Sequence, residues 1–414
     1  MDNIINGEKS FLLLGILSTI QLLAFGGISV FNLLLLMTIF IGVIYNKDCI
    51  KIDIFWCIYC ALTIITVLIS AVNMRLSQGF RHKAIIEGCV YILILVIYAL
   101  MCSNYKYALL FLKGFKISCY ATLIWSYLQL FVFKFINVDL NEFIFSGILK
   151  IQGAKGDYSG QQLIPSGFYS HRAILLPSMI FLFFTTSNIY IIFAIYIIAL
   201  LSKSVALILG LAVATSFKMF IRRGRIGDNI VKIKVVRLLF IICLIGTTVF
   251  LEKDRILELG QYIIQRIADS TSNKYDNSSV VHYLYYRNFG AIIKNENIIN
   301  FLFGTGFGTS GQHYTWFNNQ YSNLSSWVVE NDYINIFLNQ GFFGFFAWIY
   351  FELRIIFVSK KVKNLENIGL IITALFIGLF YNIQFNWFIL VEIAIYFLAT
   401  ENINFFADNK EETL

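Results

Sequence analysis

Residues 54–72 read IFWCIYCALTIITVLISAV and contain no charged side chain. A helix that crosses a bilayer needs about 20 such residues, because the hydrocarbon core is roughly 30 Å thick. Comparable apolar runs lie at about 11–25, 28–45, 84–102, 108–133, 170–186, 189–202, 204–221, 236–251, 332–357, 367–383 and 386–400. We therefore expect an all-α, polytopic integral membrane protein of about 12 transmembrane helices, with residues 1–414 forming a single transmembrane domain.

The composition agrees with this class of protein. Hydrophobic residues make up 58% of the chain and charged residues 14%, with a mean hydropathy of +0.73, whereas soluble domains are roughly 25% charged. The net charge of +8 follows the predicted membrane topology rather than forming a basic patch, so we expect no nucleic-acid partner.

The seven cysteines all lie in or beside apolar runs, which predicts no disulfide framework. Cys57 and Cys60 have the spacing of a redox or metal motif, but no second ligand pair accompanies them within the apolar helix. Ordinary packing is the favoured interpretation. We expect no metal site and no cofactor.

Basic residues in short loops predict the orientation, because such residues remain on the cytoplasmic side. Four basic groups alternate correctly with twelve spans, and all fall on the side of the termini: 47–51, 106–116, 222–237 and 354–363. Both termini are therefore expected in the cytoplasm. Segments 134–169 and 252–331 then face outward, and 252–331 is the one large external loop.

Several cations contradict this bias, since Arg75, Arg81, Lys83, Arg172 and Lys203 fall at the external side. Each could be satisfied singly by lipid headgroups. Charges at such depths more often face a polar cavity, and together they indicate an anionic ligand. The guanidinium group binds phosphate through paired hydrogen bonds, so the pyrophosphate of a lipid headgroup is the expected anion.

The external loop contains two further patterns. Residues 279–294 place apolar side chains on one face of an amphipathic helix that carries Arg287. The glycine-rich stretch Gly304–Gly308, which includes Gly306, lacks the lysine of a nucleotide-binding loop, so it is either a tight turn or a backbone cradle near substrate. Nearby aromatic and amide residues suit either sugar recognition or an interfacial belt; they include His282, Tyr283, Tyr285, Tyr286, His313, Tyr314, Trp316, Asn318, Asn319, Gln320 and Trp327.

Two acids, Glu330 and Asp332, precede the predicted span at 332–357. Partial burial at a membrane rim would suit either carboxylate to act as a general base. Both would equally suit the N-terminus of a helix, where the helix dipole favours negative charge. Local sequence leaves these two interpretations open.

A family resemblance bears on this choice. The pair Glu330-Asn331, followed by an apolar helix with Gly341 and Gly344, resembles a motif of the O-antigen ligase and polymerase superfamily. Upstream segments are similar to other motifs of this family in order and spacing, over roughly residues 160–400: Ser166-Gly167-Phe168 before His171-Arg172, Leu201–Ser204 with Lys203, Arg287, and Phe303–Gly308. Glu330 stands where the ligases carry histidine, which disfavours the ligase branch.

The resemblance implies a membrane glycosyltransferase of the bacterial inner membrane that polymerises polyprenyl-pyrophosphate-linked repeats into O-antigen or capsular polysaccharide. Glu330 would be the general base, with Asn331 or Asp332 orienting it, and Arg287 would stabilise the leaving pyrophosphate. Further substrate-binding candidates are Arg75, Arg81, His171, Arg172, Lys203 and Gly306. Whether a chain-length-regulating membrane protein acts as a partner is left open. The alternatives are an O-antigen ligase and a flippase for lipid-linked oligosaccharide.

Overall fold

The computed structural model describes residues 2–20, 22, 24–25, 28–45, 53–151, 155–159, 162–169, 174–202, 204–225, 278–318, 329–382, 384, 386–403 and 405. Among these, four helices are long and apolar enough to cross a membrane: α3 (Ile54–Val72), α4 (Gln78–Ser103), α5 (Tyr105–Ile136) and α14 (Asp332–Lys361). The prediction of a mostly helical chain with membrane-spanning character is thereby confirmed.

Shorter helices accompany them at other predicted apolar runs: α1 (Asp2–Leu17), α2 (Val30–Tyr45), α6 (Leu175–Thr185), α7 (Ile189–Leu201), α8 (Val205–Arg225), α15 (Leu365–Gly378) and α16 (Asn386–Thr400). The predicted span at 236–251 and the first part of the predicted external loop lie outside the described residues. The count of twelve spans therefore stays a prediction.

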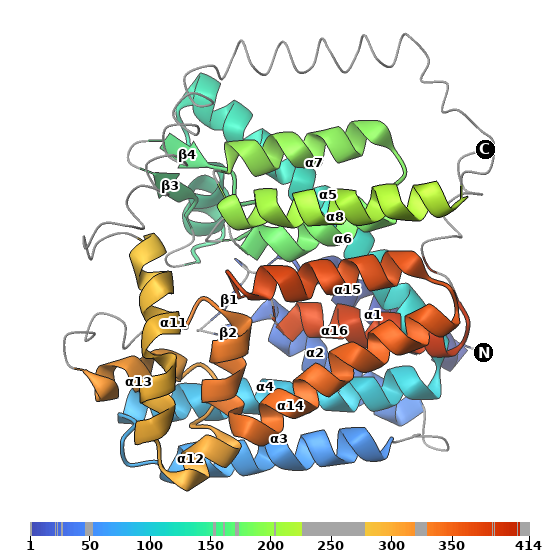
Figure 1. The fold of residues 1–414 in the computed structure, drawn as a ribbon. Helices are drawn as coiled ribbons and strands as arrows, with labels where there is room; N and C mark the ends of the chain where they lie inside the picture. The colour runs from blue at the N-terminus through green and yellow to red at the C-terminus, as the bar shows by residue number, and fades with distance from the viewer. Residues whose placement is uncertain are drawn as a thin grey trace.

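The apolar helices pack side by side, and three further helices gather at one end of the bundle (Figure 1). These are α11 (Ser278–Asn295), α12 (Ile298–Phe303) and α13 (Ser310–Phe317). The helix predicted at 279–294 is thus confirmed as α11. A π-helical turn (Glu142–Ile148) and two antiparallel strand pairs, β1 (Ala24–Phe25) with β2 (Ile28–Ser29) and β3 (Asp157–Ser159) with β4 (Gln162–Ile164), complete the described elements.

Helix starts are fixed by polar side chains. Asp53 accepts a hydrogen bond from the Phe55 backbone N–H at 3.1 Å, and Asn104 accepts one from Lys106 at 3.0 Å. These caps satisfy N–H groups that the first helical turn leaves unpaired. Within a bilayer the remaining backbone groups must pair inside the helix, which is why long apolar runs become helices there.

Two ion pairs at opposite ends of α3 define the two ends of the bundle. Asp53 Oδ2 lies 2.6 Å from the guanidinium of Arg354, which is close to the end of α14. Beyond the other end of α3, the Arg75 guanidinium lies 4.0 Å from Glu296 Oε2, in the connection between α11 and α12. The α11–α13 end is therefore distinct from the end where α3 begins.

The predicted helix at 332–357 proves to be sharply bent. Gly341 has φ +70° and ψ −171°, which interrupts α14. The interruption exposes carbonyl groups of the preceding turn, and the turn after α12 uses them: Thr305 N–H donates to Leu338 O at 3.2 Å and Gly306 N–H donates to Asn339 O at 3.0 Å. The glycine-rich stretch and the bent helix thus form one structural unit.

Candidate functional site

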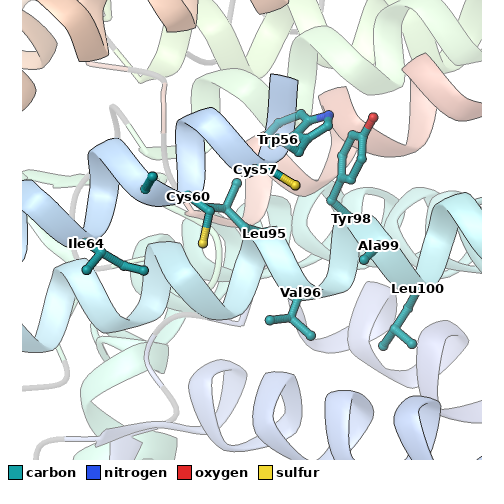
Figure 2. Close-up of a pocket in the computed structure, with 10 residues that line it drawn as sticks. Trp56, Cys57, Cys60, Ile64, Leu95, Val96, Tyr98, Ala99 and Leu100 are labelled. Atoms are coloured by element: carbon teal, nitrogen blue, oxygen red, sulfur yellow. The ribbon is translucent and has the colours of Figure 1, made fainter. Parts of the chain in front are cut away.

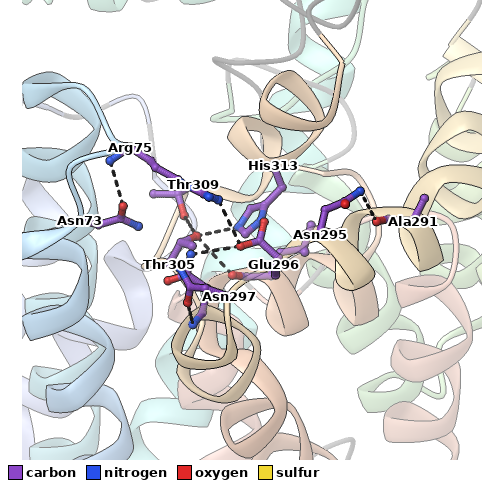
Figure 3. Close-up of polar contacts among 11 residues, drawn as sticks. Asn73, Arg75, Ala291, Asn295, Glu296, Asn297, Thr305, Thr309 and His313 are labelled. Atoms are coloured by element: carbon purple, nitrogen blue, oxygen red, sulfur yellow. Dashed lines mark hydrogen bonds and ion pairs between the residues drawn. The ribbon is translucent and has the colours of Figure 1, made fainter.

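A cavity of about 640 Å³ opens at the α11–α13 end of the bundle. Its lining combines charged, amide, aromatic and aliphatic side chains: Arg75, Ile292, Asn295, Glu296, His313, Trp316 and Phe317. They come from the α3–α4 turn, from α11 and the residue after it, and from α13 (Figure 3). Segments more than 200 residues apart in sequence therefore build one pocket.

The centre of this pocket is a close pair between Glu296 and His313. Glu296 Oε1 lies 2.7 Å from His313 Nδ1, and only 8% of the Glu296 side chain and 2% of the His313 side chain are exposed. Burial would raise the pKa of the Glu296 carboxyl. The hydrogen bond and charge of His313, the amide of Asn300 and the charge of Arg75 outweigh burial and lower that pKa. Glu296 is therefore a carboxylate at neutral pH.

A chain of short hydrogen bonds continues from the imidazole. His313 Nε2 lies 2.7 Å from Thr305 Oγ1, which lies 2.8 Å from Thr309 Oγ1, and that hydroxyl donates to Gly306 O at 2.6 Å. Both ring nitrogens of His313 are therefore engaged, one by Glu296 and the other by this chain of hydroxyl groups.

Arg75 supplies the accessible charge of the pocket. Half of its side chain (52%) is exposed, and its contact with Glu296 is long, at 4.0 Å. Its guanidinium carbon lies 5.9 Å from the centre of the Trp316 ring, and its backbone N–H donates to Asn73 Oδ1 at 3.0 Å (Figure 3). The fork of N–H donors is thus held beside the pocket with capacity to bind an added anion.

The lining suits an amphiphilic anion better than a purely apolar ligand. Trp316 and Phe317 offer rings for the apolar faces of a sugar, while Asn295 and Arg75 offer hydrogen-bond donors. His313 has both ring nitrogens engaged and is almost fully buried, so its function is to position the wall of the pocket. Within the described parts of the chain, no group of three or more His, Cys, Asp or Glu side chains could hold a metal ion.

Five of the predicted substrate-binding residues fall in three groups. Arg75 lines the pocket. Arg81 is half-buried on α4 with a buried Nε that has no hydrogen-bond partner among the described residues. Arg172, His171 and Lys203 lie outside the described residues.

Gly306 has a structural function in the turn after α12. Its φ is +118°, and a Cβ at this position would lie 2.0 Å from Ser70 Oγ and 3.0 Å from Ala84 Cβ. The positive φ and the contact with α3 both require glycine. This geometry fits the tight-turn interpretation, and Gly306 does not line the pocket.

Arg287 and Glu330 are not joined in the structure. Arg287 is exposed on α11 and forms no ion pair with Glu330 in the described regions, while Glu330 is half-buried just before α14. Burial, followed by the negative charge of Glu330, raises the pKa of Tyr285 on α11, which indicates that the carboxylate lies near that ring. The predicted meeting of Arg287 with Glu330 across a ligand therefore has no direct contact behind it.

Asn331 caps α14. Its Oδ1 accepts from Ile334 N–H at 2.9 Å, and its Nδ2 donates to Leu379 O at 2.6 Å and to the Tyr286 hydroxyl at 2.6 Å. These bonds engage both ends of the amide, so it holds the helix start rather than orienting Glu330. Asp332 is 1% exposed, and its Oδ1 accepts from the Gln384 backbone N–H at 3.3 Å. Of the three neighbours, Asn331 is the cap.

Sequence reasoning missed the Glu296–His313 pair. Glu296 lies in a polar stretch of the loop without a motif, and His313 was singled out only as one of many aromatic and polar residues there. The two residues are 17 positions apart and meet because α12 and the glycine-rich turn reverse the chain. In the sequence, only the glycine-rich turn could have indicated that Glu296 and His313 come close together.

A second cavity, of about 440 Å³, lies between α3 and α4 and is almost entirely apolar (Figure 2). Cys57 and Cys60 line it together with Trp56, Ala61, Ile64, Leu95, Val96, Tyr98, Ala99 and Leu100. The cysteines are free thiols. Their surroundings match the packing interpretation of the Cys57-Cys60 spacing.

The described residues form a helical bundle that has four helices long and apolar enough to cross a membrane and a polar pocket at one end. Comparison of the chain with protein-family models finds no match, and no curated protein matches it.

Proposed function

We propose that the protein is a membrane glycosyltransferase that polymerises polyprenyl-pyrophosphate-linked oligosaccharide repeats. The observation that supports this most directly is the pocket that places Arg75 beside Trp316, Glu296 and His313. Such a lining suits a ligand that is anionic at one point and sugar-like at another. It lies beside the segments that resemble the O-antigen ligase and polymerase superfamily.

In this proposal Arg75 binds a pyrophosphate oxygen, and Trp316 and Phe317 stack on the attached sugar. Glu330 stays the proposed general base, because it lies near the pocket. The residue before it is bound to the start of α13, where the Val329 N–H donates to Ser310 Oγ at 3.0 Å. The rise of α13 from Ser310 to the pocket residue Trp316 is only about 9 Å. One oligosaccharide repeat would span the pocket and the carboxylate.

The proposed reaction exchanges one glycosidic partner for another. The acceptor hydroxyl forms a new bond to the anomeric carbon of the donor sugar and gives its proton to Glu330. The bond from that carbon to the pyrophosphate oxygen breaks, and the electron pair leaves with the pyrophosphate. Arg75 and Arg287 are the cations proposed to stabilise the charge that grows on this leaving group. A base contributes about 10²- to 10⁴-fold to such a step.

The test is a gel of surface glycan from cells whose own copy is deleted and replaced by variants. We expect deletion, Glu330→Gln and Arg287→Ala to leave single-repeat products without long chains. Lys360→Ala, an exposed change in the last turn of α14, is the matched control. Normal chain-length ladders from Glu330→Gln and Arg287→Ala, at wild-type protein levels, would refute the assignment of these residues.

A second candidate function is a flippase for lipid-linked oligosaccharide. It is favoured by one observation, the two glutamates buried among the helices, Glu352 and Glu392, because acids within membrane spans often serve transport. The same deletion discriminates the candidates. Loss of all surface-attached glycan, rather than retention of single repeats, would favour a flippase or a ligase.

A further inference from the structure

Two buried acids from different helices meet inside the bundle. Glu352 lies on α14 and Glu392 on α16, and each is 1% exposed. The side-chain nitrogen of Gln384 donates to Oε1 of both, at 3.3 Å for Glu352 and 3.0 Å for Glu392. Trp348 Nε1 adds a bond to Glu352 Oε1 at 3.0 Å. We call these two glutamates the acid pair.

The acid pair has more hydrogen-bond acceptors than donors. Oε2 of Glu352, Oε2 of Glu392 and Oε1 of Gln384 are all buried without a hydrogen-bond partner among the described residues. The two carboxyl groups are held close together, because Oε1 of each accepts from the same Gln384 nitrogen. If both were ionised, neither could donate a hydrogen to the unpaired oxygens, because a carboxylate only accepts. Buried acceptors without donors are unfavourable, because they have lost their hydrogen bonds to water.

Among the described residues, no cation compensates the charge of the pair. In the described chain, no Lys, Arg or His forms an ion pair with Glu352 or Glu392. The titratable groups that act on the pair or respond to it are an acid and three phenols: Asp332, Tyr59, Tyr91 and Tyr333. Two adjacent buried negative charges without a cation are strongly unfavourable, and a shared proton is how such pairs are usually stabilised.

We propose that Glu352 and Glu392 bind one proton between them and form an intramembrane proton site bridged by Gln384. A proton taken from solvent binds Oε2 of one glutamate and is donated to the other. This step reduces the charge of the pair from two negative charges to one and fills the missing hydrogen bond. No other reactant is consumed.

The site is connected to the polar end of the bundle. The Gln384 backbone N–H donates to Asp332, and five residues earlier Leu379 O accepts from Asn331 and from the Tyr286 hydroxyl. Segment 379–384 therefore joins the acid pair to the start of α14 and to α11. A change in protonation that moves Gln384 would be transmitted to these contacts.

The inference stands on the acid pair alone and does not require the proposed function. Infrared spectroscopy of the purified full-length protein in lipid nanodiscs at neutral pH tests it directly. We expect the C=O stretch of a protonated carboxylic acid, with a shift to lower frequency in D2O. Glu352→Gln and Glu392→Gln should each shift or remove this band, and the double variant should lack it.

Glu401→Gln, at an exposed acid after α16, is the matched control and should leave the band unchanged. Absence of the band from the wild-type protein would overturn the proton site, and that result needs no variant to fold. Persistence of an unaltered band in the double variant would overturn it equally. Neither readout involves glycan, so a failed proton site and a failed glycosyltransferase proposal are distinguishable.

Discussion

At the residue scale, Glu296 connects three parts of the polar pocket. Its carboxylate contacts His313 on α13, Asn300 on α12 and Arg75 beyond α3. A buried carboxylate with several donors is stabilised in its ionised form. The pocket therefore depends on the charge of one residue that no sequence motif marks.

Glu296→Gln tests this dependence. We expect the variant to unfold at lower temperature than the wild type at neutral pH, because a charge-assisted hydrogen bond of about 1.5–3 kcal/mol is weakened. The folded state lowers the pKa of Glu296, so its stabilisation is complete above the ordinary glutamate pKa and is lost as pH falls through the lowered value. Melting curves of both proteins in detergent should therefore converge in acid.

The control for that comparison is Glu401→Gln, which makes the same substitution at an exposed acid after α16, outside the pocket. A constant difference between Glu296→Gln and wild type at every pH would contradict a stabilising carboxylate. It would instead indicate that the glutamine simply packs less well.

Arg75→Ala should separate binding from folding. Its side chain is 52% exposed and its ion pair is long, so the free energy of unfolding should change by only about 0–1 kcal/mol. Loss of one charged contact to a pyrophosphate should weaken polymerisation about 10- to 100-fold. Arg75→Lys should not fully restore it, because an ammonium group lacks the planar fork. Chain length on glycan gels and melting temperature measure the two effects.

A wild-type glycan ladder from Arg75→Ala would exclude Arg75 from donor binding. Lys83→Ala supplies the comparison, since Lys83 is a nearby cation on α4 that already pairs with Glu87 at 3.8 Å. We expect that variant to retain long chains.

At the element scale, the bend in α14 creates the junction on which the pocket is built. A Cβ on Gly341 would lie 2.4 Å from the backbone nitrogens of Phe303 and Gly304, and φ there is +70°. A Cβ on Gly304 would likewise lie 2.2 Å from the carbonyl oxygen of Asn339 and 2.3 Å from its carbonyl carbon. The two glycines therefore allow α12 and α14 to touch through their backbones.

Gly341→Ala should destabilise the protein by about 3–5 kcal/mol, as backbone strain and overpacking add. The fraction of monodisperse protein in size-exclusion profiles and the melting temperature would report this loss. Gly290→Ala is the matched control, because Gly290 lies inside α11 with open space around it. There alanine should gain up to about 1 kcal/mol from helix propensity. Equal melting of the two variants would contradict the backbone contact.

The elements were predictable to different degrees. Apolar runs such as 54–72 became helices because length and hydrophobicity alone determine that outcome in a bilayer. The bend at Gly341 was not predicted, since it depends on a partner turn nearly 40 residues earlier in the chain. Arg75 could be singled out from the sequence because its charge contradicts the predicted orientation, whereas Glu296 and His313 meet only through the tertiary contact that the turn creates.

At the scale of the whole molecule, the predicted orientation assigns the pocket to the external side. The α3–α4 turn lies with the pocket, and the end of α14 lies at the opposite end of the bundle with the start of α3 (Figure 1). Basic residues 354–363 are at that opposite end, which the positive-inside rule places in the cytoplasm.

Single cysteines introduced at these two ends test the orientation. In a background whose seven native cysteines are replaced, Met74→Cys would sit in the α3–α4 turn, at a position 94% exposed. Lys360→Cys would sit in the exposed last turn of α14. A thiol reagent that cannot cross the inner membrane is added to cells whose outer envelope has been made permeable and whose inner membrane is intact. It should label Met74→Cys only. Lysis should make Lys360→Cys reactive as well, which shows that its thiol is accessible to the reagent.

Labelling of Lys360→Cys but not of Met74→Cys in intact cells would show that the orientation is the reverse of the predicted one. The polar pocket would then face the cytoplasm, and a glycan delivered on the outer face could not reach Arg75.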